Sequence, residues 1–596
     1  MATVNEYFRI ISSTIAKCDI ATSADRDEIY RSARAVVQEQ LDWADMDHER
    51  HRRDDESAKL NAAIHEIENT FSTRHGLIIA TAEMNASAAN EINFQRSAAG
   101  EDIDESPAEV SSNSGAMSKM GQSRQFAANV GAGTVVNIIR VLFQLVSLPI
   151  LARILTPSDY GVYALALPTV SLFMMLADGG LGVSLARESE DNRILWSTAF
   201  WTLLATCSLM GVLVCASGFV LAWISGESVL IGLMAFLSAA LPLLAFTVVA
   251  DARLIRRGNL IYHCAADLCG LITGAATGLF VAFHGGGAWS LAAQFVSSLA
   301  IRAIMLNLAA RSRPYFEFEF SSLAEHVSIG GWLLMMRISD TVGRIVENSF
   351  FGRFFGPELL GSYTLALQLV RFSCESVTNP ILSAFYAHAV RHQQSDVGRM
   401  HLFLSRVILT ILIPFAVILS ILAPKILPLI LGDQWNHAAA FVRILIVPYA
   451  IAGASWLSGQ VLLKNGIVAR NTLINVLINI FRVISIFCGI LLDSLTIAWL
   501  LAASYVIQAV ALTVAVPDGL GAAKNDLLNT FALILLSSSL AGIFVYALDS
   551  LGGEGWLTFA TEISLGGLVY LFSLFLLMRN TFRNDYYSLM NFIRPS

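Results

Sequence analysis

Four charged residues recur at helical spacing within an otherwise apolar stretch of the chain. Arg337, Asp340, Arg344 and Glu347 are three, four and three residues apart, so a helix would carry them on one face. A guanidinium keeps its charge in poorly solvating surroundings and binds phosphate or carboxylate oxygens through paired hydrogen bonds. The spacing therefore predicts a helical face that binds an anion, with carboxylates beside the cations.

Three further apolar stretches carry polar residues at similar spacing. These series are Asn137, Arg140 and Gln144; Gln368, Arg371, Glu375 and Asn379; and Asn471, Asn475, Asn479 and Arg482. Because such groups are costly where they face lipid, we expect the series to line one hydrated cavity. Two kinds of residue are expected to bind the substrate there. Those that would bind its anionic group are Arg140, Arg337, Arg344, Arg371 and Arg482, and those that would form hydrogen bonds with it are Asn137, Gln144, Gln368, Asn475 and Asn479. The alternative is that neighbouring opposite charges only neutralise one another and hold the helices together.

The elements that position these residues are membrane-spanning helices. The chain has 596 residues, of which 55% are hydrophobic and 14% charged, whereas soluble domains average about 25% charged residues. A span needs about 20 mostly apolar residues. The sequence offers fourteen such stretches, at 130–152, 160–183, 195–223, 229–250, 260–283, 288–309, 327–349, 359–388, 402–422, 439–462, 472–492, 495–515, 527–548 and 557–578. We therefore predict an all-α polytopic membrane protein.

The charges of the connecting loops predict its orientation. With the N-terminus inside, the inner segments carry 18 Lys and Arg residues, whereas the outer loops carry Arg153, Arg353 and Lys425, with Arg443 at a boundary. Positive charge collects on the cytoplasmic side of a membrane protein. The asymmetry predicts an even number of spans with both termini in the cytoplasm.

The N-terminal segment has a different composition from the rest. Residues 1–120 hold 12 basic and 22 acidic residues, a net charge of −10, whereas residues 121–596 hold 27 and 24, a net charge of +3. Residues 1–80 show helical spacing of apolar residues and no signal-peptide pattern, so we expect a cytoplasmic helical extension. Residues 81–123 have few large apolar residues and are expected to form a flexible linker.

An internal repeat divides the spans. Residues 152–167 read ARILTPSDYGVYALAL and residues 352–367 read GRFFGPELLGSYTLAL, with seven identities that include Pro157 with Pro357 and Gly161 with Gly361. Six spans separate the two segments, so the repeat is parallel, as in transporters whose halves rock about a central site. We expect a first half at 124–315, a second half at 316–520, and two additional spans with a short cytoplasmic tail at 521–596.

The same region carries a family resemblance. It reads LPILARILTPSDYGVYALALPTVSLFMMLADGGLG at 148–182, ILPLILGDQWNHAAAFVRILI at 426–446 and LLKNGIVARNTLINVLINI at 462–480. These segments resemble the Wzx-type oligosaccharide and polysaccharide flippases, a branch of the superfamily that also holds the MATE exporters and the lipid II flippase. The resemblance covers roughly residues 124–580.

The resemblance implies a function and a location. It implies an alternating-access flippase in the bacterial inner membrane that moves a polyprenyl-diphosphate-linked oligosaccharide to the periplasmic leaflet, for exopolysaccharide, capsule or O-antigen synthesis. It implies a cationic cavity for the head group while the lipid tail stays among membrane lipids. Two alternatives stay open: an ion-coupled exporter of a small solute, and a membrane-embedded polysaccharide polymerase or ligase.

The remaining expectations concern ions, enzymes and partners. Asp178, Asp340, Glu347 and Glu375 are candidates for coupling to H⁺ or Na⁺, since a carboxylate at membrane depth can change protonation when water reaches it. For Asp178 a structural role at a helix end is an equal alternative. We expect no other cofactor, no metal site and no nucleic acid partner. Because the sequence carries no catalytic motif, we also expect that the protein is not an enzyme. Residues 1–120 are expected to dock glycosyltransferases or polymerase and export components, or to be dispensable.

Overall fold

The computed structural model describes residues 139–186, 193–311, 331–389, 394–489, 492–519, 524–550 and 555–593, with residues 64, 136, 315 and 522 as single positions. The chain divides into two units, Met1–Lys119 and Met120–Ser596, and the fold below is that of the second. The predicted extension at 1–80 and linker at 81–123 lie outside the described residues except for residue 64, so both stay predictions.

Helices joined by short turns make up the described part of the second unit. A first helical segment covers 139–154. The helices that follow are α5 Pro157–Asp178, α6 Leu181–Ala186, α7 Arg193–Ser225, α8 Val229–Leu237, α9 Ala240–Arg256, α10 Leu260–Phe283, α11 Ala288–Ala310, α12 Gly331–Ala389, α13 Gln394–Leu431, α14 Asn436–Lys464, α15 Val468–Gly489, α16 Ser494–Ala515, α17 Lys524–Asp549 and α18 Trp556–Ile593. A 3₁₀ turn, η2, lies at Asp433–Trp435.

Eleven helices within these described ranges are long and apolar enough to cross a membrane. Helices α8 and α9 together form one of them. The others are α5, α7, α10, α11 and each helix from α13 to α18. The part of the chain that the structure describes is thus that of a helical, multi-pass membrane protein. The expected first span is described only from residue 139, and the expected seventh and eighth spans fall within the long helix α12. The count of fourteen therefore stays a prediction.

Helix α12 consists of two limbs that meet at a glycine. Gly356 has a φ of 82° and a ψ of 164°, a conformation that glycine adopts without a steric penalty. Pro357 follows it, and proline favours the first position of a new helix because its nitrogen carries no hydrogen to donate. We refer to residues 331–355 as the first limb of α12 and to residues 357–389 as the second limb.

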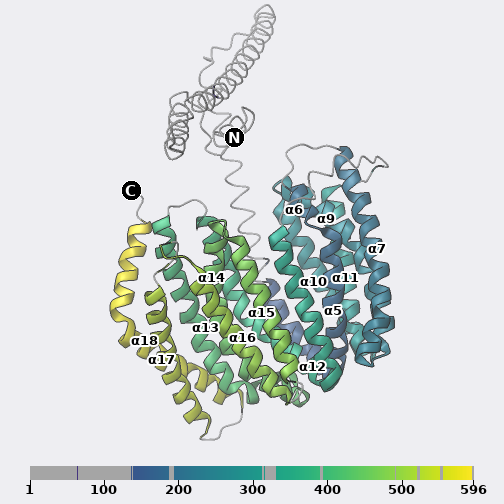
Figure 1. The fold of residues 1–596 in the computed structure, drawn as a ribbon. Coiled ribbons are helices and arrows are strands. Elements are labelled where there is room, and N and C mark those ends of the chain that lie inside the picture. Colours follow the sequence, from purple (N-terminus) through teal and green to yellow (C-terminus); the bar gives the residue numbers. More distant parts are fainter. Residues whose placement is uncertain are drawn as a thin grey trace, which may run out of the picture. The chain divides into compact units, whose positions relative to one another are not determined.

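The helices collect in two groups. Figure 1 shows α5, α7, α9, α10 and α11 on one side and α13 to α18 on the other. Helix α12 links the groups, since it packs extensively against α5 as well as against α14 and α15. Inward-facing side chains such as Trp196, Phe351 and Trp435 are almost completely buried within this arrangement. Large apolar side chains such as Trp223 and Leu557 are more than four-fifths exposed, as expected for surfaces that face lipid.

Candidate binding cavity

A cavity of about 780 Å³ lies where the two groups of helices meet. Its wall is formed by the 139–154 segment, α5, α10 and α11 on one side and by α12, α13, α15 and α16 on the other. The first limb of α12 contributes Asp340, Arg344 and Glu347, and the second limb contributes Gln368 and Arg371. Residues that are spaced along one helical face in the sequence therefore reach the same cavity.

One side of the cavity is charged. Arg344 forms an ion pair with Asp340 one turn earlier in α12, with 3.2 Å between Nη2 and Oδ2. Both side chains remain more than a third exposed, so this pair can exchange its partners for water or ligand at little cost. Glu347 is buried and accepts a hydrogen bond from the hydroxyl of Tyr363. Glu347 is thus held by the protein, whereas Arg344 is accessible.

Two further arginines complete the charged side. Arg371 lines the cavity, and its Nε is buried without a hydrogen-bond partner among the described residues. Arg482, on α15, is hydrogen-bonded at 3.1 Å to Ser504 Oγ and at 3.0 Å to Gln508 Oε1. Its guanidinium carbon lies 4.4 Å from the ring centroid of Tyr505. Arg482 is therefore fixed in orientation, whereas Arg371 has an unused donor.

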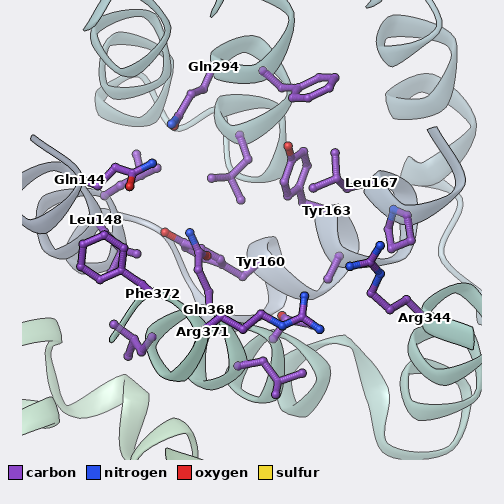
Figure 2. Close-up of a pocket in the computed structure, with 18 of the residues that line it drawn as sticks. Gln144, Leu148, Tyr160, Tyr163, Leu167, Gln294, Arg344, Gln368, Arg371 and Phe372 are labelled. Carbon is purple, nitrogen blue, oxygen red and sulfur yellow. The ribbon is translucent and has the colours of Figure 1, made fainter. Parts of the chain in front are cut away.

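The other side of the cavity is polar but uncharged. Its polar lining residues are Gln144, Ser147, Tyr160, Tyr163, Ser171, Gln294 and Ser298. Figure 2 shows Gln294 across the cavity from Arg371, with Tyr160 and Tyr163 between them and Gln144 toward one edge. Of these residues, only Gln144 belongs to a series of polar residues at helical spacing in the sequence. Single Gln, Ser and Tyr residues in apolar helices resemble ordinary helix–helix contacts, and so give little signal.

Most of the predicted site residues line this cavity. They are Arg344, Arg371, Arg482, Gln144, Gln368, Asn479, Asp340 and Glu347. Asn137 lies outside the described residues. Arg140, Arg337, Asn475, Asp178 and Glu375 do not line the cavity, so their predicted roles as ligands or coupling residues stay predictions without geometric support.

Arg140 forms part of a charged network whose residues do not line the cavity. Its Nη2 lies 2.9 Å from Asp267 Oδ2, and Arg302 Nε lies 2.7 Å from Asp267 Oδ1. Arg302 also pairs with Asp251 at 3.3 Å, and His263 Nδ1 lies 2.5 Å from that same carboxylate. Members of the network come from the 139–154 segment, α9, α10 and α11. Arg140 is therefore paired with a carboxylate of another helix rather than placed at the cavity wall.

The other predicted residues that do not line the cavity either form hydrogen bonds nearby or are exposed. Asp178 ends α5 and accepts hydrogen bonds from the backbone N–H groups of Gly180 and Gly182, both at 3.3 Å, so it shapes the turn into α6. Glu375 accepts a hydrogen bond of 2.6 Å from the hydroxyl of Tyr449. Arg337 is exposed.

Asn475 takes part in a series of hydrogen bonds. It accepts one of 3.0 Å from Gln508 and donates one of 2.8 Å to the carbonyl oxygen of Asn471. Because Gln508 also holds Arg482, Asn475 supports the charged side of the cavity from behind. It does so without lining the cavity itself.

The two groups of helices are joined at the end of the bundle where Arg153 and Pro157 lie. Arg153 donates hydrogen bonds to the carbonyl oxygens of Leu429 and Ile430, at 2.7 and 2.8 Å, near the end of α13. The indole of Trp435 donates to Ala152 at 2.8 Å, and Gln434 donates to Ala152 at 2.8 Å. We refer to Arg153, Gln434 and Trp435 as the latch.

Comparisons with known proteins bear on this architecture. Residues 150–440 match the family model described as polysaccharide biosynthesis protein. The succinoglycan biosynthesis transport protein ExoT of Rhizobium meliloti (strain 1021) is 25% identical over 311 residues, covering 51% of this chain and 62% of ExoT. The lipopolysaccharide biosynthesis protein WzxC of Escherichia coli (strain K12) is 23% identical over 327 residues, covering 52% and 64%. The match thus spans less than two thirds of each relative.

Solved structures share the fold. The lipid II flippase MurJ in an inward closed conformation superimposes with a TM-score of 0.62 at 12% identity, covering 76% of this chain and 99% of MurJ. An inward-facing multidrug resistance MATE family transporter gives a TM-score of 0.51 at 12% identity, covering 64% and 95%. The family resemblance predicted from the sequence is confirmed over residues 150–440, and the fold is one that these transporters share.

Proposed function

We propose that this chain, a relative of the polysaccharide biosynthesis proteins over residues 150–440, is a flippase for a polyprenyl-diphosphate-linked oligosaccharide. The observation that carries the proposal is the arginine-bearing side of the cavity, above all Arg371 Nε, for which the described residues supply no hydrogen-bond partner. A buried donor without a partner is costly, and a diphosphate oxygen would satisfy it. Arg344 and Arg482 line the same cavity and would share the negative charge.

The proposed mechanism is alternating access between two six-span halves, followed by two additional spans. The sequence repeat supports it, since both members of the repeat start helices at the same end of the bundle. The latch supports a state in which the halves touch at that end. During transport we expect this end to open while the opposite end closes, so the head group crosses within the cavity and the lipid tail stays in the membrane.

The proposed location is the bacterial inner membrane, with both termini in the cytoplasm. The excess of Lys and Arg in alternate loops supports this orientation. It places the latch at the periplasmic side. The head group would therefore enter from the cytoplasm and leave into the periplasmic leaflet.

A proton or sodium ion is the proposed driving ion. Asp340 and Glu347 line the cavity next to the arginines, so both would sense the arrival of an anionic head group. Asp178 and Glu375 have less support than these two, because each accepts hydrogen bonds away from the cavity wall.

The alternatives fit the cavity less well. An exporter of small cations would favour a wall with excess carboxylates, whereas this wall carries Arg344, Arg371 and Arg482 against Asp340 and Glu347. A polymerase or ligase would hold a growing glycan outside the membrane, and the outer loops predicted from the sequence are short.

We also propose that residues 1–120 dock enzymes that load the lipid, which deletion of these residues and a search for lost partners would test.

The function is tested in inverted membrane vesicles given a labelled lipid-linked oligosaccharide. We expect the label to become protected in the vesicle lumen without lengthening of the glycan. Arg371→Ala should abolish most of this protection, whereas Arg399→Ala, which removes an exposed arginine of α13, should not. Glycan extension without translocation would instead identify a polymerase.

A further inference from the structure

The two sides of the cavity differ in charge. All five charged lining residues, which are Asp340, Arg344, Glu347, Arg371 and Arg482, come from α12 and α15. The described lining residues of the 139–154 segment, α5, α10 and α11 include no charged side chain. We call these two surfaces the charged wall and the neutral wall.

The neutral wall is uncharged although its helices contain charges. Arg140, Asp267 and Arg302 belong to the same helices, but they pair with one another away from the cavity. The polar groups that do reach the cavity are the amides of Gln144 and Gln294, the hydroxyls of Ser147, Ser171 and Ser298, and the tyrosines. This separation follows from which helical faces carry the ionisable residues.

Close packing of α10 on α11 fixes the position of the neutral wall. Gly274 and Gly278 are four residues apart on the face of α10 that meets α11. A Cβ at Gly274 would lie 2.7 Å from Ser298 Cβ, and a Cβ at Gly278 would lie 2.9 Å from Gln294 Cβ, both too close for real atoms. The absence of side chains at these glycines therefore sets the depth of Gln294 and Ser298 in the cavity.

Resting on the function proposed above, we propose that the neutral wall is a sugar subsite and the charged wall is the diphosphate subsite. Amides and hydroxyls offer both donors and acceptors, which matches the hydroxyl groups of a sugar ring. Tyr160, which is buried, and Tyr163, which is partly buried, also line the cavity and add apolar surface for the ring carbons. The neutral wall offers no opposite charge that would compete with Arg344 and Arg371 for the diphosphate.

The size of the cavity limits what the subsite can hold. Its 780 Å³ lies within the range of about 300–1,000 Å³ that encloses a drug-sized ligand. A diphosphate with the first sugar rings fits that range, whereas a long glycan would extend out of the cavity. The subsite is thus expected to recognise the reducing-end sugar, and Gln144, Gln294 and Ser298 are the specificity-determining residues.

The test compares two probes on the purified full-length protein: undecaprenyl diphosphate, and undecaprenyl diphosphate carrying one glucose. Gln294→Ala keeps the packed Cβ and removes the rest of the side chain with its amide, and Gln144→Ala repeats the test on another helix. We expect each change to weaken binding of the glucose-bearing probe by about three- to tenfold, the effect of one lost hydrogen bond. Binding of the bare diphosphate should not change. Gln460→Ala is the control, because this partly buried glutamine of α14 does not line the cavity.

The outcomes separate the inference from the function on which it rests. Arg371→Ala should weaken binding of both probes. If it does so while Gln294→Ala and Gln144→Ala either change neither probe or weaken both equally, the sugar subsite is wrong and the diphosphate site stands. If Arg371→Ala changes neither probe, the diphosphate site itself is wrong, and so is the sugar subsite that depends on it.

Discussion

Gly161 lies directly against the backbone of Pro357, so a Cβ placed on this glycine would be 1.8 Å from the proline carbonyl oxygen. The contact is reciprocal, because a Cβ on Gly361 would be 1.7 Å from the carbonyl oxygen of Pro157. These four residues are the Pro and Gly positions that the two segments of the sequence repeat share. Equivalent points of the repeat therefore touch each other where α5 crosses the second limb of α12.

We predict that Gly161→Ala and Gly361→Ala each destabilise the protein and reduce export. An added methyl group at either site would overlap a backbone carbonyl, and overpacking of this kind costs about 1–3 kcal/mol or more. The measurement is the thermal unfolding of purified variants in detergent, together with polysaccharide export in a strain that lacks the native protein.

Gly567→Ala is the matched control. This glycine lies in α18, and a Cβ there would meet no atom within 4 Å. Its substitution should leave both unfolding and export near the wild-type level. Equal behaviour of Gly161→Ala and Gly567→Ala would mean that α5 and α12 do not need this close approach.

We predict that Arg153→Ala opens the cavity at the latch. The change removes two hydrogen bonds from a charged donor to the carbonyl oxygens of Leu429 and Ile430. Such bonds are stronger than neutral ones, although the exposure of Arg153 reduces their net contribution. The measurement uses Thr364→Cys, which places a thiol at the cavity wall, in a chain whose seven native cysteines are replaced. Labelling by a membrane-impermeant maleimide in right-side-out vesicles should become several-fold faster.

Arg353→Ala provides the comparison, since Arg353 is the repeat counterpart of Arg153. It is exposed and makes no hydrogen bond or ion pair with the part of the chain that the structure describes. Its substitution should leave the labelling rate unchanged. A similar acceleration in both variants would point to general loosening rather than to the latch.

Local spacing predicted much of the fold and the charged part of the site. Helical stretches and the repeat can be read from the pattern of apolar residues, and the series on α12 reached the cavity because residues three and four apart share a helical face. Asp340, Arg344 and Glu347 are examples, and all three line the cavity.

The remainder depended on contacts between residues far apart in the chain. Arg140 was expected in the cavity, but its partner Asp267 is 127 residues away on another helix, and no local rule shows that pairing. Gln294 and Ser298 carry no charge and so resemble ordinary packing residues. The signal that could have identified them is the spacing of Gly270, Gly274 and Gly278, which indicates a close helix–helix contact on that face of α10.

We predict that Asp267→Asn destabilises the packing of α10 with the 139–154 segment and α11. Arg140 and Arg302 would each lose a partner, while their side chains are 38% and 31% exposed. The free energy of unfolding is expected to fall by an amount on the order of 1–3 kcal/mol, which lies between the small effect of an exposed ion pair and the larger effect of a buried one. A double-mutant cycle with Arg140→Gln, measured by unfolding in detergent, should give a coupling energy within the range of about 0.5–3 kcal/mol seen for contacting residues.

The exposed pair of Asp396 and Arg399 calibrates this measurement. Its atoms are 2.6 Å apart, yet the Arg399 side chain is 77% exposed. The corresponding cycle should give a coupling energy near zero. If the Arg140–Asp267 cycle also gives zero, the charged network does not hold these helices together, and Arg140 would again be a candidate ligand of the transported head group.

We predict that Glu347, rather than Glu375, couples transport to protons. Both carboxylates accept a hydrogen bond from a tyrosine, Tyr363 for Glu347 and Tyr449 for Glu375, but only Glu347 lines the cavity. A head group that binds there changes the electrostatic surroundings of Glu347 directly. Glu347→Gln cannot titrate, so transport in vesicles should lose its dependence on an imposed pH gradient, whereas Glu375→Gln should retain it. Retained dependence in Glu347→Gln, with protein of normal abundance and unfolding temperature, would exclude Glu347 as the coupling residue and leave Asp340 as the remaining carboxylate of the cavity wall.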